Sequence, residues 1–113
     1  MEKKILIVDD EPSILNLLDK AFVKAGFVPV TAGSAEEALK ILEHDNIQVM
    51  FLDLKLPGRN GIELCAAIRK DNPIAFIYAM TGYGSVFELA ECRDIGFDDY
   101  FLKPVDLKTF IKT

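Results

Sequence analysis

The chain has 113 residues, of which 50% are hydrophobic and 27% are charged, and its formal net charge is -5. This length and composition are typical of one compact globular domain and leave no room for a second. The acidic balance argues against direct binding to nucleic acid, because neutralising phosphates needs clustered Lys and Arg. We therefore expect a single domain over residues 1–113.

Signals for export, membrane insertion and cysteine chemistry are also weak. The apolar run Ile5–Val8 is too short for a secretory signal, and no stretch approaches the ~20 apolar residues that span a bilayer. We therefore expect a cytoplasmic protein with no membrane partner. Cys65 and Cys92 lie far apart and His44 is the only histidine, so we expect neither a disulfide framework nor a zinc site.

Short apolar runs alternate with amphipathic segments along the chain, a pattern typical of a parallel sheet flanked by helices. Lys4–Val8 is a continuous run, as expected for a central strand that is covered on both faces. Helical spacing predicts a helix over Pro12–Ala25, with a core-facing stripe of Ile14, Leu17, Leu18, Ala21, Phe22 and Ala25. Phe27–Thr31 is a strand that carries Pro29. Because proline has no N–H to donate, this strand is placed at an edge, outside the first strand.

The alternation continues through the rest of the chain. Ser34 and Glu37 form a capping box, in which each side chain satisfies a free N–H at the start of a helix. Ile47–Leu52 is the most apolar run and ends abruptly at Asp53. The remaining elements are predicted as a helix over 62–70, a strand over 74–80, a weaker helix over 85–93, a strand over 100–102 and a short last helix over 105–113.

Five strands joined by right-handed helical crossovers give a doubly wound, flavodoxin-like three-layer sandwich with the predicted strand order 2-1-3-4-5. In such sheets, ligands bind beyond the carboxyl ends of the strands, here between the first and third strands. Asp9 and Asp10 follow the first strand and Asp53 ends the third, so we expect their carboxylates in one crevice. Thr81 and Lys103 end the fourth and fifth strands and should bring a hydroxyl and an ammonium group to the same rim.

Several carboxylates in one crevice repel one another and stay ionised only if a cation compensates them. Oxygen ligands that leave water positions open favour Mg²⁺ or a similar hard ion such as Mn²⁺. Each acid taken alone has a simpler interpretation, because Asp9 and Asp10 could cap the helix that follows them or complement its dipole. Their combination with Asp53 favours a metal site.

The ordered set of motifs resembles the receiver domain of two-component response regulators over nearly the whole chain. The resemblance rests on an acidic pair after the first strand, an aspartate that closes an apolar strand, and characteristic residues at the later strand ends and in the turn after Asp53. These residues are Asp9, Asp10, Asp53, Pro57, Gly58, Gly61, Thr81, Gly82, Lys103 and Pro104.

The resemblance implies that Asp53 is the phosphoacceptor, a carboxylate nucleophile that becomes an acyl phosphate. It further implies that Asp10 and Asp53 bind Mg²⁺ directly, that the backbone carbonyl of Lys55 is a third ligand, and that Asp9 acts mostly through water. Lys103 would pair with the phosphoryl oxygens, and Thr81 would donate its hydroxyl to one of them.

The resemblance also implies a switch and a set of partners. Tyr100 is the aromatic residue expected to turn inward when Thr81 moves, and the Lys103–Pro104 peptide bond is expected to be cis. The fourth helix, the fifth strand and the fifth helix would form the output face, used by an output domain or for homodimerisation. The phosphoryl donor would be a sensor histidine kinase or a histidine phosphotransfer protein.

Other classes of protein remain open from the residues alone. A flavodoxin-like flavin carrier needs a hydroxyl- and glycine-rich loop after the first strand to hold a phosphate, which Asp9, Asp10 and Glu11 would repel. A dinucleotide enzyme needs a Gly-rich turn at the same place, and the sequence has none there. An aspartate-nucleophile phosphatase usually has a second acid two residues after the nucleophile, where this chain has Lys55. A receiver-like module that binds a partner without phosphorylation is the last alternative.

Overall fold

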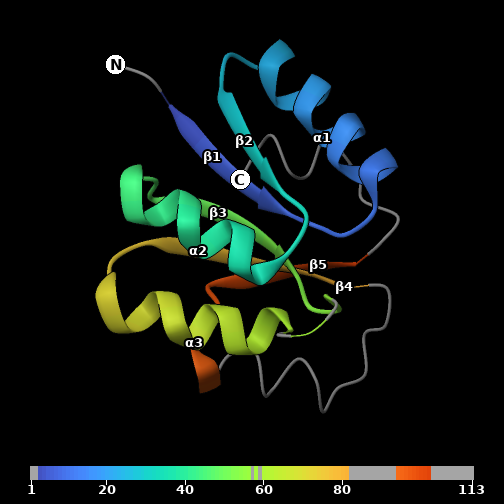
Figure 1. Ribbon diagram of the computed structural model, residues 1–113. Coiled ribbons are helices and arrows are strands. Elements are labelled where there is room, and N and C mark those ends of the chain that lie inside the picture. Colours follow the sequence, from blue (N-terminus) through green and yellow to red (C-terminus); the bar gives the residue numbers. More distant parts are fainter. Residues whose placement is uncertain (1–2, 57, 59, 82–93, 103–113) are drawn as a thin grey trace.

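The computed structural model describes residues 3–56, 58, 60–81 and 94–102 (Figure 1). Its elements are β1 (Lys4–Val8), α1 (Pro12–Lys24), β2 (Val28–Ala32), α2 (Ala35–His44), β3 (Val49–Asp53), α3 (Gly61–Asp71), β4 (Phe76–Thr81) and β5 (Asp99–Leu102). The strands form one parallel sheet in the order β2-β1-β3-β4-β5, which confirms the predicted topology. β2, which carries Pro29, is an edge strand as predicted.

Helices cover both faces of the sheet and give three layers: α1 lies on one side, and α2 and α3 lie on the other (Figure 1). Successive side chains of β1 point to opposite faces. Ile5 and Ile7 pack with Phe22 of α1, whereas Leu6 and Val8 belong to the larger cluster beneath α2 and α3. Burial on both faces explains why the apolar run of β1 is continuous. Within the described ranges, no helix is long and apolar enough to cross a membrane.

Several predicted boundaries were wrong by one or two residues. β3 and β4 both begin two residues later than predicted and end one residue later, so that Asp53 and Thr81 are themselves the last residues of their strands. The predicted start of β4 was too early because Ile74 is apolar, as strand residues often are, but it is 80% exposed and precedes the strand. In the predicted core-facing stripe of α1, Leu17 is also apolar but 50% exposed. Ala25, predicted as the last residue of this helix, is its C-cap.

The fourth helix was predicted to end at Arg93, but Asp94 and Ile95 are still helical. The residues predicted for the fourth helix, 85–93, and the predicted last helix over 105–113 lie outside the described residues. Cys65 is buried and His44 is exposed.

The predicted capping box at the start of α2 is present in altered form. Ser34 Oγ accepts a hydrogen bond from the Glu37 N–H at 3.2 Å, as predicted. Glu37 Oε2 accepts from the Gly33 N–H at 3.1 Å, one residue before the cap. Both bonds satisfy backbone donors where the chain enters the helix.

An aromatic cluster fills part of the sheet face beneath α1 and contains one tyrosine. The Phe51 and Tyr78 rings stack with centroids 5.1 Å apart, and Phe101 lies 5.9 Å from Tyr78. Burial raises the pKa of the Tyr78 phenol above its usual 10.0, and the charges of Asp98 and Asp99 raise it further. The folded chain therefore holds this proton more tightly than the unfolded chain does.

This shift predicts how stability depends on pH. The favourable contribution of the neutral phenol is complete below about pH 10 and is lost as the pH rises through the folded pKa of Tyr78. We expect the free energy of unfolding, measured by urea denaturation in alkaline buffers, to fall more steeply in the wild type than in Tyr78→Phe. Parallel pH profiles for the two proteins would contradict the shift.

Candidate functional site

Three aspartates from two neighbouring strands meet at the carboxyl edge of the sheet. Val8 of β1 pairs with Leu52 of β3, so the residues that follow them arrive side by side. One carboxylate oxygen from each of Asp9, Asp10 and Asp53 lies within 4.8 Å of the others. Asp9 and Asp53 are buried, at 0% and 4% exposure, whereas Asp10 is exposed. The crevice is therefore acidic at its base and open to solvent at Asp10.

Local hydrogen bonds orient the two buried carboxylates. Asp9 Oδ1 accepts from the Glu11 N–H at 3.0 Å, and Asp53 Oδ1 accepts from the Lys55 N–H at 3.1 Å. Each bond reaches two residues along the chain, which is how aspartate stabilises a turn after a strand. The residue at the N-cap of α1 is Glu11, not Asp9 or Asp10. The simpler interpretation of the acidic pair as helix caps is therefore wrong.

The donor set fits a hard divalent cation. Three carboxylates within a few ångströms repel one another, and two of them have little solvent to screen them. All the side-chain donors are oxygens, which Mg²⁺ and Mn²⁺ prefer over softer metals. Lys55 follows Asp53 by two residues, and its side chain is exposed. The backbone carbonyl of Lys55 therefore belongs to a residue that is close to Asp53 in the sequence. Its role as a metal ligand stays a prediction.

The structure brings the end of β4 next to Asp53. Asp53 pairs with Met80, and the Leu54 N–H donates to the Met80 carbonyl at 3.0 Å, so that Thr81 follows at the same edge. Thr81 in turn pairs with Leu102, the last residue of β5. The backbone register therefore places the ends of β3, β4 and β5 along one rim.

The structure describes the predicted switch residue, Tyr100, but not the predicted cation, Lys103. Tyr100 is half-buried in β5 and packs against the cluster beneath α2 and α3. Lys103 and Pro104, with the predicted cis peptide bond, lie outside the described residues. Their roles stay predictions.

Gly61 supports the site in a way that the sequence did not reveal. It is the first residue of α3, and its N–H donates to the Leu54 carbonyl at 3.1 Å. A Cβ atom on Gly61 would lie 2.2 Å from the backbone oxygen of Asp53. Asn60 caps the helix by accepting from the Glu63 N–H at 2.9 Å. This Asn60 to Glu63 spacing is the sequence signal that could have placed the helix start beside Asp53.

The sheet order and the acidic crevice at the switch point define a doubly wound α/β domain with an acidic rim that could hold a cation. A model of the response regulator receiver domain matches residues 5–113, and the chain belongs to this family.

Similar proteins and structures agree with this assignment. The chain is 38% identical over 104 residues to the alkaline phosphatase synthesis transcriptional regulatory protein PhoP of Bacillus subtilis (strain 168), covering 92% of this chain but only 43% of PhoP. It is 34% identical over 107 residues to the sporulation initiation phosphotransferase F of the same organism, covering 95% of this chain and 86% of that protein. A CheY-like receiver domain protein from Methanospirillum hungatei JF-1 superposes with a TM-score of 0.94 at 30% identity, covering 99% of this chain and 90% of that one.

The chain is thus a receiver domain of two-component phosphorelay signalling, a family whose role is to accept a phosphoryl group on an aspartate. It is a phosphoacceptor rather than a metabolic enzyme. Receiver domains bind Mg²⁺ in an acidic pocket, and the cluster of Asp9, Asp10 and Asp53 is an acidic site of this kind. The interpretations as a flavin carrier and as a dinucleotide enzyme are set aside by the family assignment.

Proposed function

We propose that Asp53 is the aspartate that accepts the phosphoryl group and that Mg²⁺, or Mn²⁺, binds beside it. Asp10, Asp53 and the backbone carbonyl of Lys55 would bind the ion, and Asp9 would act mostly through water. The observation that carries the proposal is the convergence of three carboxylates within 4.8 Å at the end of β3. A bound divalent ion supplies positive charge that offsets the charge of the incoming phosphoryl group.

In the proposed reaction, an Asp53 carboxylate oxygen attacks the phosphorus of a phosphohistidine donor. An O–P bond forms as the P–N bond breaks, and the electron pair leaves with the imidazole. The 3.1 Å hydrogen bond from the Lys55 N–H holds Asp53 in one orientation, which favours in-line attack. Lys103 would pair with the phosphoryl oxygens. The domain itself would thus promote both phosphoryl transfer and slow hydrolysis of the acyl phosphate.

The signal would then pass from the rim to the output face, which the fourth helix, β5 and the fifth helix would form. Thr81 ends β4 next to the position that pairs with Asp53, and in the proposal its hydroxyl contacts the phosphoryl group. Tyr100, on the neighbouring strand, would turn inward as Thr81 moves. The cis Lys103–Pro104 peptide bond is part of the same proposal.

Partners are proposed from the family and from the names of relatives. A sensor histidine kinase or a histidine phosphotransfer protein would supply the phosphoryl group. The chain spans less than half of PhoP, a transcriptional regulatory protein. An output domain, or a second copy of the chain, would use the face formed by the fourth helix, β5 and the fifth helix. The cytoplasmic location stays a prediction.

The proposal is tested by incubating the chain with Mg²⁺ and acetyl phosphate and then measuring its intact mass. We expect the wild type to gain one phosphoryl group slowly, and Asp53→Asn or wild type with a chelator to gain none, because the nucleophile or the compensating charge is missing. Asp71→Asn, an exposed acid at the end of α3, serves as the matched control and should behave as the wild type.

Each alternative predicts a different result in this assay. A wild type that gains no phosphoryl group would favour the module that binds a partner without phosphorylation. Rapid multiple turnover of acetyl phosphate would favour the phosphatase. Phosphorylation that persists in Asp53→Asn would move the acceptor to another residue.

A further inference from the structure

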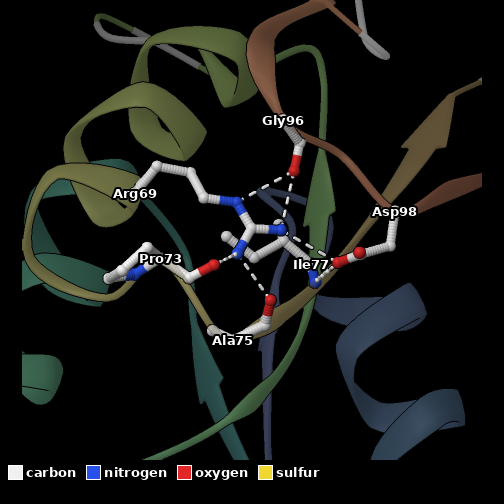
Figure 2. A network of polar contacts seen from close by, with 6 residues as sticks. All are labelled: Arg69, Pro73, Ala75, Ile77, Gly96 and Asp98. Atoms are coloured by element: carbon white, nitrogen blue, oxygen red, sulfur yellow. Dashed lines mark hydrogen bonds and ion pairs between the residues drawn. The ribbon is translucent and has the colours of Figure 1, made fainter.

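The guanidinium group of Arg69, near the end of α3, contacts the segments that precede β4 and β5 (Figure 2). These segments lie at the amino ends of the strands, whereas the crevice lies at the carboxyl ends. It donates from Nε and Nη2 to the Gly96 carbonyl at 2.9 and 2.7 Å, and from Nη1 to the Pro73 carbonyl at 3.2 Å. Nη1 also donates to the Ala75 carbonyl, and Nη2 donates to Asp98 Oδ2 at 2.9 Å. The end of α3 is thereby tied to the segments that precede β4 and β5.

Asp98 continues this connection into the sheet. Its Oδ2 accepts from the Ile77 N–H at 2.7 Å, and its own N–H donates to the Ile77 carbonyl at 2.8 Å. Both backbone groups of one β4 residue are thus engaged by the residue that immediately precedes β5. Tyr78 and Asp99 then form the first pair of the β4–β5 ladder. Asp98 is therefore bonded to β4 directly before the point where that ladder begins.

β5 needs such an anchor because it is short and lies at the edge of the sheet. It has four residues, and among the described strands it pairs with β4 alone. Register is weakly specified in a short edge strand, and a slip of one residue moves every side chain to the other face. In β5 a slip would exchange Tyr100 and Phe101, which pack in different clusters on the two sides of the sheet.

The residues around Arg69 fit a planar guanidinium group rather than any cation. A Cβ atom on Gly96 would lie 3.2 Å from Arg69 Nε, so the glycine leaves room for the side chain to reach the backbone. Arginine can donate to several carbonyls and a carboxylate at once, whereas a lysine ammonium lacks this fixed fork of donors.

We infer that Arg69 and Asp98 are positioning residues for phosphoryl transfer, because they set the register of β5 on β4. This inference rests on the proposed function. In the proposed function Lys103 pairs with the phosphoryl oxygens, and in the sequence it follows Leu102, the last residue of β5, which pairs with Thr81. A shift in the register of β5 would therefore move the point from which the chain continues to Lys103. The clustered carboxylates instead come from β1 and β3. Loss of the anchor should therefore slow phosphorylation while leaving metal binding intact.

The test measures both quantities in the same variants. Arg69→Gln and Asp98→Ala are compared with the wild type for the rate of phosphorylation by acetyl phosphate at saturating Mg²⁺, and for Mg²⁺ affinity in an NMR titration. We expect the rate to fall about tenfold to a hundredfold, the loss typical of an ångström-scale misplacement, and the affinity to stay within about twofold. Asp45→Asn is the matched control, because it breaks the 2.8 Å Lys4–Asp45 ion pair, which is similarly exposed.

Two milder variants keep the test decisive if the first pair folds poorly. Arg69→Lys keeps the charge but loses the fork, and Asp98→Asn keeps an acceptor for the Ile77 N–H. Both should give a smaller loss of rate, again without loss of Mg²⁺ affinity, and weaker NOEs between Tyr78 and Asp99.

A wild-type rate in the folded variants, or a parallel loss of Mg²⁺ affinity, would overturn the inference. A similar loss of rate in Asp45→Asn would do the same. If the wild type is phosphorylated and the variants match it, only this inference fails. If the wild type takes no phosphoryl group, the proposed function fails first and the inference with it.

Discussion

Asp10→Asn is expected to weaken Mg²⁺ binding at least about tenfold, because it removes one of the proposed direct ligands. Without metal, the same substitution should raise the free energy of unfolding, because it relieves repulsion among the three carboxylates. The gain should be only about 1 kcal/mol, because solvent screens the exposed Asp10. In the wild type, Mg²⁺ at about ten times its dissociation constant should add roughly 1.4 kcal/mol of stability, and at the same Mg²⁺ concentration this gain should fall to about 0.4 kcal/mol or less in the variant. Urea denaturation with and without Mg²⁺ measures all three effects.

The control for this prediction is an acid of equal charge outside the crevice. Asp71→Asn changes the net charge in the same way, and its stability should respond to Mg²⁺ as the wild type does. An undiminished response in Asp10→Asn would remove Asp10 from the metal site. A metal-free Asp10→Asn protein less stable than the wild type would show that favourable contacts of Asp10 outweigh the repulsion from its two neighbours.

The sheet could be predicted from the sequence because two-sided burial leaves a clear pattern. Strands covered on both faces are continuously apolar, and Pro29 placed β2 at an edge. The errors arose at Leu17 and Ile74, which are apolar but 50% and 80% exposed. An apolar residue is a candidate for burial, and only its neighbours in space decide whether it is covered.

The carboxylate cluster followed from the sequence because strand order fixes which strand ends meet. Asp9, Asp10 and Asp53 could be brought together on this basis alone, whereas the roles of Thr81 and Lys103 depended on resemblance to a family. The anchor of β5 left no such signal. Arg69 and Asp98 are 29 residues apart, and both would pass for solvated charges in any local pattern.

Gly61→Ala is expected to be among the most damaging single substitutions in the chain. The added Cβ would lie 2.2 Å from the Asp53 oxygen and 2.9 Å from Leu54 Cα, and these backbone atoms have no rotamer by which to move aside. Overpacking at a rigid site costs ~1–3 kcal/mol and occasionally more, and we expect the upper end here. Because the displaced backbone belongs to Asp53, the rate of phosphorylation by acetyl phosphate should fall as well. Urea denaturation and intact-mass kinetics measure the two effects.

Two other glycines provide a graded comparison with Gly61. At Gly33 the nearest contact of a new Cβ would be Glu37 Oε2 at 3.7 Å, so Gly33→Ala should be nearly neutral. At Gly58 nothing lies within 4 Å, but the φ of +75° is unfavourable for a residue with a side chain, so Gly58→Ala should cost about 1 kcal/mol. Gly61→Ala should exceed both. A stability loss in Gly61→Ala no larger than in Gly58→Ala would mean that the loop between β3 and α3 moves easily, and Asp53 would then owe its position to other contacts, such as the Lys55 N–H.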